Sequence, residues 1–252
     1  MIICKHVTAG YGKQPVLQDI TLSFRPGEVM AVIGPNGCGK STLLRTALGL
    51  LKPMSGEVCY DEVPIDRLSV REVARKAAFL TQSRDTPNIP AEKLVLHGRF
   101  PWLGFPRQYG KRDREIAKAA MESTNCLGLA EKMLPELSGG QRQEVYLAMT
   151  IAQTTKTLFM DEPTTYLDIC NQLQLLQSAR KAADEGKAVV MVLHDIPQAL
   201  LFADRIALLQ NGRLVLCDVP EKVAASGKIE EVFSVRLTSI ETPEGVRYLC
   251  GL

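Results

Sequence analysis

One glycine-rich stretch has the residue types and spacing that bind phosphate. The stretch is GPNGCGKS, from Gly34 to Ser41, and it follows an apolar segment that predicts a buried strand over 29–33. Glycines let the backbone take positive φ and turn N–H groups inward, and a helix that starts at such a turn binds anions. In this pattern the amides surround the phosphates, Lys40 reaches the β and γ oxygens, and the Ser41 hydroxyl ligates Mg²⁺. The sequence thus predicts a nucleoside triphosphate site formed by Gly34, Pro35, Asn36, Gly37, Cys38, Gly39, Lys40, Ser41 and Thr42.

Two carboxylates follow another apolar segment. The segment TLFMDE over 157–162 predicts a strand that ends at Asp161 and Glu162. Buried charges need partners, and a magnesium phosphate site would supply them. Asp161 is therefore predicted to hold Mg²⁺ with Ser41, and Glu162 to polarise the attacking water. The alternative is that these residues only start a turn and a helix.

A second glycine-rich helix start has no lysine. Ser138, Gly139, Gly140 and Gln141 combine a hydroxyl with free amides, which is again an anion site, although the same composition is typical of an ordinary cap or linker. The chain then has two candidate phosphate-binding segments but only one strand that carries the magnesium ligand and the base. If the second segment completes the nucleotide site of another copy, a head-to-tail pair closes as a two-fold dimer.

Three further residues are candidates for the same site. His194 ends an apolar strand and is predicted to hydrogen-bond at the γ-phosphate, although strand-end histidines are often structural. Tyr11 is a candidate to stack on the base, with an ordinary loop tyrosine as the alternative. Gln82 follows a predicted strand where a proline-rich segment begins, and is a candidate to sense the metal or the water.

Composition excludes several classes of protein. Among 252 residues, 30 basic and 28 acidic side chains leave a net charge of +2, so we expect no nucleic-acid partner. Seven cysteines are scattered singly, which favours free thiols in a reducing cytoplasm. No stretch resembles a signal peptide or a membrane span, so any membrane role is expected to act through a partner.

The arrangement of elements predicts an α/β fold. Apolar segments alternate with helical patterns, which predicts a core of parallel strands over 16–24, 29–33, 77–80, 157–160, 188–193 and 206–209. Residues 210–213 predict a hairpin turn, and the proline-rich segment that follows residue 84 precedes helices near 112–127 and 139–153. We therefore predict one domain over 1–252, with a core over 1–84 and 154–219, an inserted helical subdomain over 85–153, and an appendix over 220–252 that ends in a weak hairpin near 242–245.

In this order, these motifs resemble the ATP-binding cassette (ABC) ATPases. The resemblance covers nearly the whole chain, and the Ser138 to Gln141 signature separates this family from other phosphate-loop proteins. It implies a RecA-like phosphate-loop core with a small N-terminal antiparallel β part. The resemblance also implies ATP as the nucleotide, with Tyr11 as the adenine-stacking aromatic, Gln82 as the lid glutamine, Glu162 as the catalytic base, Asp168 as the dimer-contact aspartate and His194 as the switch histidine.

A finer resemblance is to the ATPase subunits of iron-siderophore, haem and cobalamin importers. It depends on HGRFPW over 97–102, on residues 147–149 and 152–153, and on DEPTTYLDI over 161–169. Two residues depart from that group, because Asn171 replaces a frequent histidine and Glu144 a common arginine. Phe100 and Trp102, with Phe105, either pack the subdomain or form a groove for a helix of a membrane permease.

The resulting hypothesis is an ATP-hydrolysing importer subunit. Two copies would close on two ATP molecules at the cytoplasmic face of the membrane, docked on permease subunits and served indirectly by an extracellular or periplasmic binding protein. A soluble ABC-type assembly or translation factor is the main alternative. A phosphate-loop kinase gives no reason for the signature motif, and exporters commonly carry membrane helices in the same chain.

Overall fold

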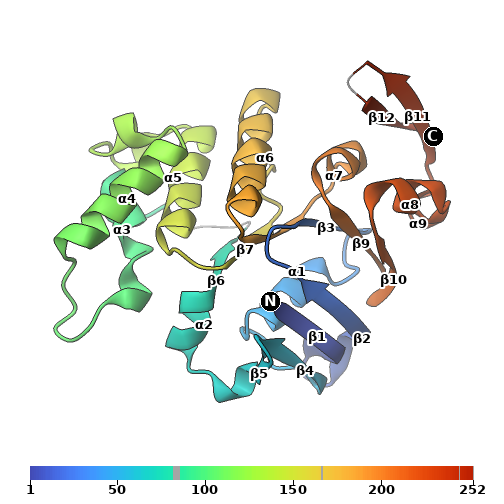
Figure 1. Ribbon diagram of the computed structural model, residues 1–252, viewed down its shortest axis with the longest axis horizontal. Coiled ribbons are helices and arrows are strands. Elements are labelled where there is room, and N and C mark those ends of the chain that lie inside the picture. The colour runs from blue at the N-terminus through green and yellow to red at the C-terminus, as the bar shows by residue number, and fades with distance from the viewer. Residues whose placement is uncertain (82–85, 166, 244, 252) are drawn as a thin grey trace.

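The computed structural model describes residues 1–81, 86–165, 167–243 and 245–251, and it contains two sheets and a C-terminal hairpin (Figure 1). The larger sheet has six strands in the order β10-β9-β3-β8-β7-β6. These strands are β3 (Val29–Ile33), β6 (Ala77–Leu80), β7 (Thr157–Asp161), β8 (Ala188–Val192), β9 (Arg205–Gln210) and β10 (Arg213–Asp218). The α/β core is confirmed.

The central strands are parallel and fully covered. Every residue of β3, β7 and β8 is buried, which explains the unbroken apolar sequences of β3 and β8 and the apolar centre of β7. Strands β9 and β10 are antiparallel and are joined at Asn211 and Gly212, both with positive φ. The predicted hairpin turn is therefore confirmed.

The strand predicted over 16–24 was assigned to the wrong sheet. It is β2 (Gln14–Phe24), which belongs to a second, antiparallel sheet in the order β2-β1-β4-β5. The other strands of this sheet are β1 (Ile2–Tyr11), β4 (Ser55–Tyr60) and β5 (Val63–Pro64). From Ile20 onward β2 alternates between buried and more exposed residues, as expected for a sheet covered on one face, and this alternation separates it from the parallel strands.

Helices α3, α4 and α5 lie between β6 and β7 in the chain and extend to one side of the sheet (Figure 1). Helix α3 (Ala91–His97) lies inside the segment that was predicted to be a proline-rich loop, because Pro90 precedes its first turn rather than interrupting it. Helix α4 (Lys111–Ser123) ends earlier than predicted, because Asn125 takes a left-handed conformation. Helix α5 (Gly139–Ala152) agrees with its prediction.

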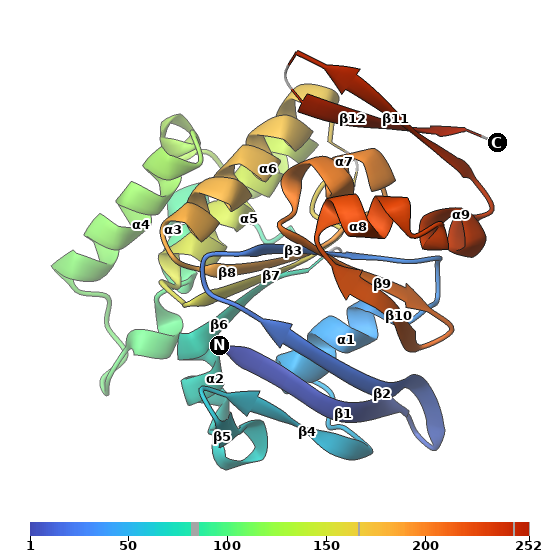
Figure 2. The same cartoon turned by 45° about the vertical axis from the view of Figure 1, so that its right-hand side comes forward.

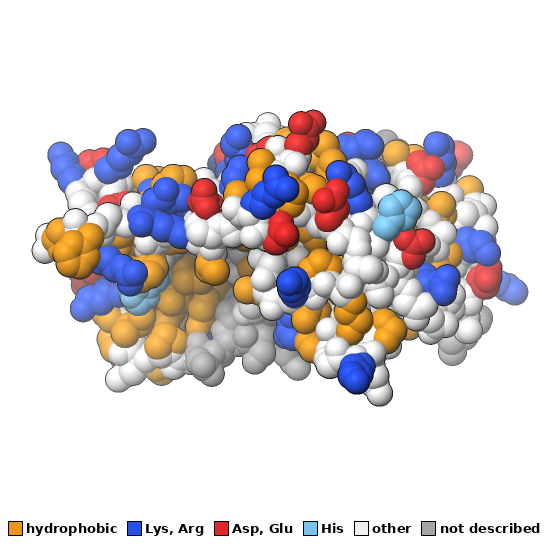
Figure 3. Space-filling view, turned by 90° about the horizontal axis from the view of Figure 1, so that it is seen from below, with side chains coloured by type: hydrophobic (Ala, Val, Ile, Leu, Met, Phe, Trp, Pro, Cys, Tyr) orange, Lys and Arg blue, Asp and Glu red, His pale blue; other side chains and the backbone are white. Residues whose placement is uncertain are grey.

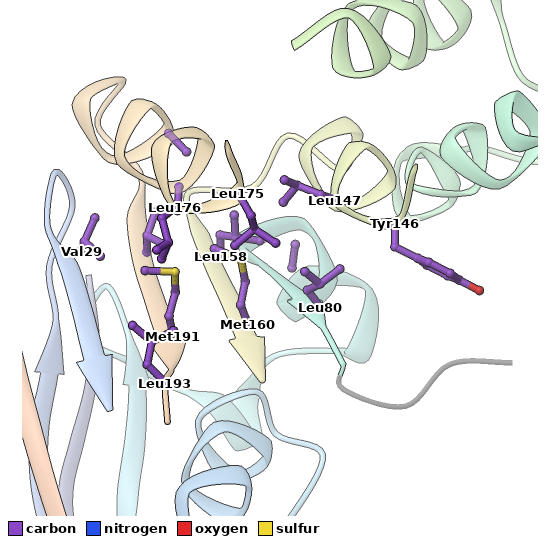
Figure 4. Packing of buried hydrophobic residues seen from close by; sticks show 14 of the residues in the cluster. Val29, Leu80, Tyr146, Leu147, Leu158, Met160, Leu175, Leu176, Met191 and Leu193 are labelled. Carbon is purple, nitrogen blue, oxygen red and sulfur yellow. The ribbon is translucent and has the colours of Figure 1, made fainter. Parts of the chain in front are cut away.

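Two apolar clusters cover the two faces of the large sheet. Residues Met30 and Val32 of β3 face the antiparallel sheet, whereas Val29, Ala31 and Ile33 face the helices. On the helical side, Leu175 and Leu176 of α6 (Ile169–Asp184) pack over β7 and β8, with Leu147 of α5 beside them (Figure 4). On the other side, the rings of Phe24 and Phe159 meet edge to face at 5.3 Å. This packing fixes where the strand ends lie.

The remaining helices flank the sheet and the C-terminal hairpin. They are α1 (Lys40–Ala47), α2 (Val70–Lys76), α7 (Ile196–Phe202), α8 (Pro220–Ala225) and α9 (Lys228–Phe233). The hairpin consists of β11 (Arg236–Thr242) and β12 (Gly245–Gly251), and it lies beside α7 (Figure 2). These two strands extend beyond the weak hairpin that was predicted near 242–245. Glu244, which belongs to that prediction, lies outside the described residues. None of the helices among the described residues has the length and apolar composition needed to cross a bilayer.

Candidate functional site

The phosphate loop connects β3 to α1 with its helix start left uncapped. Gly37 and Gly39 have φ of 77° and 106°, which side chains with a Cβ rarely adopt. Gly39 is the N-cap of α1 and has no side chain to accept from the first amides. These N–H groups therefore have no side-chain cap, which is the arrangement of an anion-binding helix start.

Lys40 lies inside this loop. Its side chain is 94% buried, and the ammonium group donates to the carbonyl oxygens of Gly34 at 2.7 Å and Pro35 at 3.0 Å. Cys38 is also buried, close under Gly34, and burial raises the pKa of its thiol. The lysine charge is thus held at the loop, while Cys38 has a packing role.

Ser41 and Asp161 are 120 residues apart in the sequence, but their side chains lie within hydrogen-bond distance. The Ser41 hydroxyl donates to Oδ1 of Asp161 at 3.1 Å. Burial raises the pKa of the Asp161 carboxyl, and the bond from Ser41 opposes that shift. No group of three or more His, Cys, Asp or Glu that could bind a metal occurs among the described residues. One hydroxyl and one carboxylate nevertheless fit Mg²⁺, which keeps several waters and binds few protein oxygens.

Glu162 and His194 meet at the ends of adjacent strands. Nε2 of His194 lies 2.5 Å from Oε1 of Glu162, whose side chain is mostly buried. The contact forms because β7 and β8 are parallel neighbours, with Asp161 opposite Val192. Glu162 has a φ of 50°, so its backbone leaves the strand in the left-handed region. The strand-end carboxylates, the phosphate loop and the histidine therefore lie at the carboxyl ends of the neighbouring strands β3, β7 and β8.

The second glycine-rich helix start is capped by its own side chains. The Ser138 hydroxyl accepts from the Gln141 amide at 3.2 Å, and the Ser138 amide donates to Oε1 of Gln141 at 3.1 Å. Gly139 follows Ser138 as the first residue of α5. A Cβ at Gly140 would lie 2.6 Å from Nδ2 of Asn171, so a larger residue there would displace the Asn171 side chain.

Asp168 is the N-cap of α6 and bonds to the asparagine that lies against that glycine. Its carboxylate accepts from the backbone amide and the side-chain Nδ2 of Asn171, both at 2.9 Å. The structure therefore brings Asp168 and the signature segment together through Asn171. This local capping role is compatible with a further contact to another chain.

Tyr11 ends β1 with half of its surface exposed, and its hydroxyl accepts from Arg45 of α1 at 3.2 Å. Arg45 was not singled out from the sequence, although it lies one helical turn after Ser41. Thr165 was also missed; its hydroxyl donates to Oε2 of Glu162 at 3.5 Å, and the spacing of three residues was the available signal. Gln82 lies outside the described residues.

The aromatic residues of the insertion differ in their surroundings. Trp102 donates from Nε1 to the Gln153 carbonyl at 2.8 Å, and its ring lies 5.0 Å from the Arg75 guanidinium and 5.4 Å from that of Arg99. Phe105 is 99% exposed. The packing interpretation thus fits Trp102, whereas Phe105 is free to contact a partner.

A groove between α3 and α4 lies in the same subdomain. Its apolar lining includes Ile89, Leu96, Met121 and Leu127, and charged side chains such as Lys93 and Arg114 surround it. Figure 3 shows hydrophobic side chains gathered in a hollow on the side of the helical subdomain. The groove has the composition of a docking site for an amphipathic segment.

Comparison with known proteins places this geometry in a family. Residues 17–165 match the ABC transporter family, and the chain belongs to it. The chain is 38% identical to the ferric enterobactin transport ATP-binding protein FepC of Escherichia coli (strain K12), over 95% of this chain and 89% of the relative. It is 37% identical to the hemin import ATP-binding protein HmuV of Thermobifida fusca (strain YX), over 95% and 84%.

Solved structures agree with the sequence relatives. An inward-facing metal-chelate type ABC transporter matches with a TM-score of 0.85 at 25% identity, over 99% of this chain and 95% of that chain. A dimeric post-hydrolysis state of the ATP-binding cassette MJ0796, bound to ADP and Pi, matches with a TM-score of 0.76 at 29% identity, over 87% and 99%. This chain is therefore an ATP-binding ATPase of the ABC family.

Proposed function

We propose that this chain is the ATP-hydrolysing subunit of an importer for an iron-siderophore complex or a related metal chelate such as haem or cobalamin. The relatives named for ferric enterobactin and hemin import support this cargo class. The chain would work at the cytoplasmic face of the membrane, bound to permease subunits, with an extracellular or periplasmic binding protein delivering the chelate to them.

The nucleotide site would be formed by residues 34–42. Its amides and Lys40 would bind the phosphates, and Tyr11 would stack on adenine. Ser41 and Asp161, with Gln82, would hold Mg²⁺, which neutralises phosphate charge when bound. In that state Lys40 would exchange one or both of its bonds to the Gly34 and Pro35 carbonyls for phosphate oxygens.

The observation that carries the proposal is the contact between Glu162 and His194 at the sheet edge that also holds Lys40 and the Ser41–Asp161 pair. Glu162 would orient the attacking water and accept its proton, with its carboxylate held in place by His194. A carboxylate held by two partners, His194 and Thr165, is restricted to few rotamers and so positions the water reproducibly.

The signature segment would complete the site of a second copy. The Ser138 hydroxyl uses one lone pair to cap α5, and its O–H is available to donate to a γ-phosphate oxygen. Asp168 would contact the same partner copy. Two ATP molecules would then join two chains head to tail, and phosphate release would reopen the dimer.

The permease would dock on the helical subdomain. A cytoplasmic helix of the permease would lay its apolar face into the groove between α3 and α4, and the exposed Phe100 and Phe105 of the same subdomain would add to the contact. Trp102 would have a supporting role at this surface, because its ring and Nε1 are already engaged by Arg75, Arg99 and Gln153.

Substitution Glu162→Gln tests the hydrolytic part of the proposal. It removes the proton acceptor and keeps the shape, so turnover is expected to fall about a hundredfold while ATP traps the dimer. Phosphate release and light scattering, with and without ATP, measure both effects. The control is Glu57→Gln, which removes an exposed carboxylate paired with Lys5 on the antiparallel sheet and should hydrolyse ATP normally. A Glu162→Gln protein that stays monomeric in saturating ATP, or turns over near the wild-type rate, would contradict the proposal.

Affinity capture from detergent-solubilised native membranes tests the transport part. Wild type is expected to recover a polytopic membrane protein, and Phe105→Ala to recover less of it. The matched control is Ile240→Ala, which trims an exposed apolar residue of the C-terminal hairpin. Recovery of soluble partners alone would instead support a soluble assembly or translation factor.

A further inference from the structure

Two amide side chains in the first turn of α6 contact three separate segments of the chain. Asn171 bonds to Asp168 and packs against Gly140 of the signature segment. Gln172 donates from Nε2 to the Leu167 carbonyl at 2.9 Å. The turn that carries Asp168 is therefore held on both sides.

Gln172 also connects α6 to α7. Its Oε1 accepts from Nε2 of Gln198 at 2.8 Å, and the Gln198 backbone amide donates to Oδ1 of Asp195, the N-cap of α7, at 2.7 Å. Asp195 directly follows His194. A continuous series of hydrogen bonds thus joins the Leu167–Asp168 segment to the residue after the histidine that contacts Glu162.

The side chain of Gln198 has an unsatisfied hydrogen-bond acceptor, which a role in stability alone does not explain. Its Oε1 is buried and has no hydrogen-bond partner in the described part of the chain. An unsatisfied buried oxygen is destabilising, so an apolar residue of the same shape would be at least as favourable for folding. The amide keeps only the bond to Gln172, and that bond is the link between the two helices.

We propose that Gln172 and Gln198 are positioning residues that transmit the placement of Asp168 to the His194–Glu162 pair. The inference rests on the proposed function, in which Asp168 contacts a second copy. When that copy closes, α6 and α7, joined at their first turns, shift together, and His194 is held at its distance from Glu162. Without the amide pair the first turns of the two helices would be coupled only through the sheet on which both pack, and Glu162 would be poorly aligned in the closed dimer.

Substitution Gln198→Met provides the test, since it preserves shape while removing both the link and the buried oxygen. We expect kcat of the full chain to fall about five- to tenfold with KM for ATP within about twofold of wild type. The melting temperature should change little, because losing the unsatisfied oxygen of Gln198 offsets losing the donor to Gln172. Gln177→Met, at an exposed amide on α6, is the matched control and should leave kcat unchanged.

Gln172→Glu tests whether the series extends to Leu167. The carboxylate still accepts from Gln198 but cannot donate to the Leu167 carbonyl, so kcat should again fall. The double variant Gln172→Glu/Gln198→Met should be no slower than the slower single variant, because both break one series. Wild-type kcat in Gln198→Met, or fully additive losses in the double variant, would overturn the inference. In that case, normal ATP hydrolysis by the wild type and loss of hydrolysis in Glu162→Gln would still support the proposed function.

Discussion

The two glycine-rich helix starts of this chain have opposite designs. The start of α1 has a glycine N-cap with no side-chain bond, and its lysine is buried inside the loop. The start of α5 has a serine N-cap, a complete capping box with Gln141, and an exposed position. The first start leaves its amides without a side-chain cap, whereas the second satisfies its Gln141 amide within the chain.

This difference indicates how each loop would use phosphate. Open amides and a buried cation bind an anion without help from another molecule. An exposed helix start that has no buried cation and already caps its Gln141 amide is expected to hold phosphate weakly by itself, so it would act only when another surface delivers the phosphate. In the proposed dimer the first loop supplies nucleotide affinity, and the second makes closure depend on ATP.

The largest expected effect comes from the first loop. Lys40→Ala removes the buried ammonium and its bonds to Gly34 and Pro35, so hydrolysis should fall about a hundredfold or more. Binding of a fluorescent ATP analogue by the monomer should weaken as well. Lys52→Ala, at an exposed lysine just after α1, is the control and should behave as wild type. Wild-type affinity in Lys40→Ala would remove the distinction between the loops.

An intermediate effect is expected from the second loop. Ser138→Ala should lower kcat about tenfold by removing a donor to charged phosphate, with monomer affinity for ATP unchanged. Ser69→Ala is the matched control, because Ser69 forms the same capping box with Glu72 at the start of α2. Both changes should cost about 1 kcal/mol of stability. If Ser138→Ala and Ser69→Ala hydrolyse ATP equally well, Ser138 acts only as the N-cap of α5.

A negative charge introduced at Ser138 tests whether the second loop contacts phosphate. Ser138→Asp keeps an N-cap acceptor for the Gln141 amide, so α5 should remain intact. Its carboxylate would repel the γ-phosphate, so ATP-dependent dimerisation should be lost in light scattering. A Ser138→Asp protein that still dimerises with ATP would contradict a phosphate contact here.

The smallest effect is expected farther along α5. Burial raises the pKa of Glu144, so in the window between its ordinary and raised values the folded state binds more protons than the unfolded chain. Stability therefore falls as pH rises through that window and stays lower above it. Glu144→Gln should raise the melting temperature by about 1 °C at about pH 7.5 and have no such effect at about pH 4. An equal gain at both pH values would exclude the carboxyl charge as the cause.

Local pattern predicted most of the central sheet but not every boundary. Buried strands such as β3 and β8 are unbroken apolar segments, so their sequences alone identify them. Strand β2 was assigned to the parallel core because short apolar segments do not reveal which sheet they join. Helix α3 was missed because the prolines in the surrounding segment suggested a loop. Pro90 only precedes the first turn of the helix.

The phosphate loop follows from residue type and spacing, because a strand, three glycines and a helix within a few residues determine its conformation. The pairs that join distant segments come from packing. Glu162 meets His194 because β7 and β8 are neighbours, and Gln172 meets Gln198 because α6 and α7 begin at the same sheet edge. Spacing along a chain specifies local backbone geometry, whereas strand order, which long-range apolar burial selects, decides which strand ends lie together.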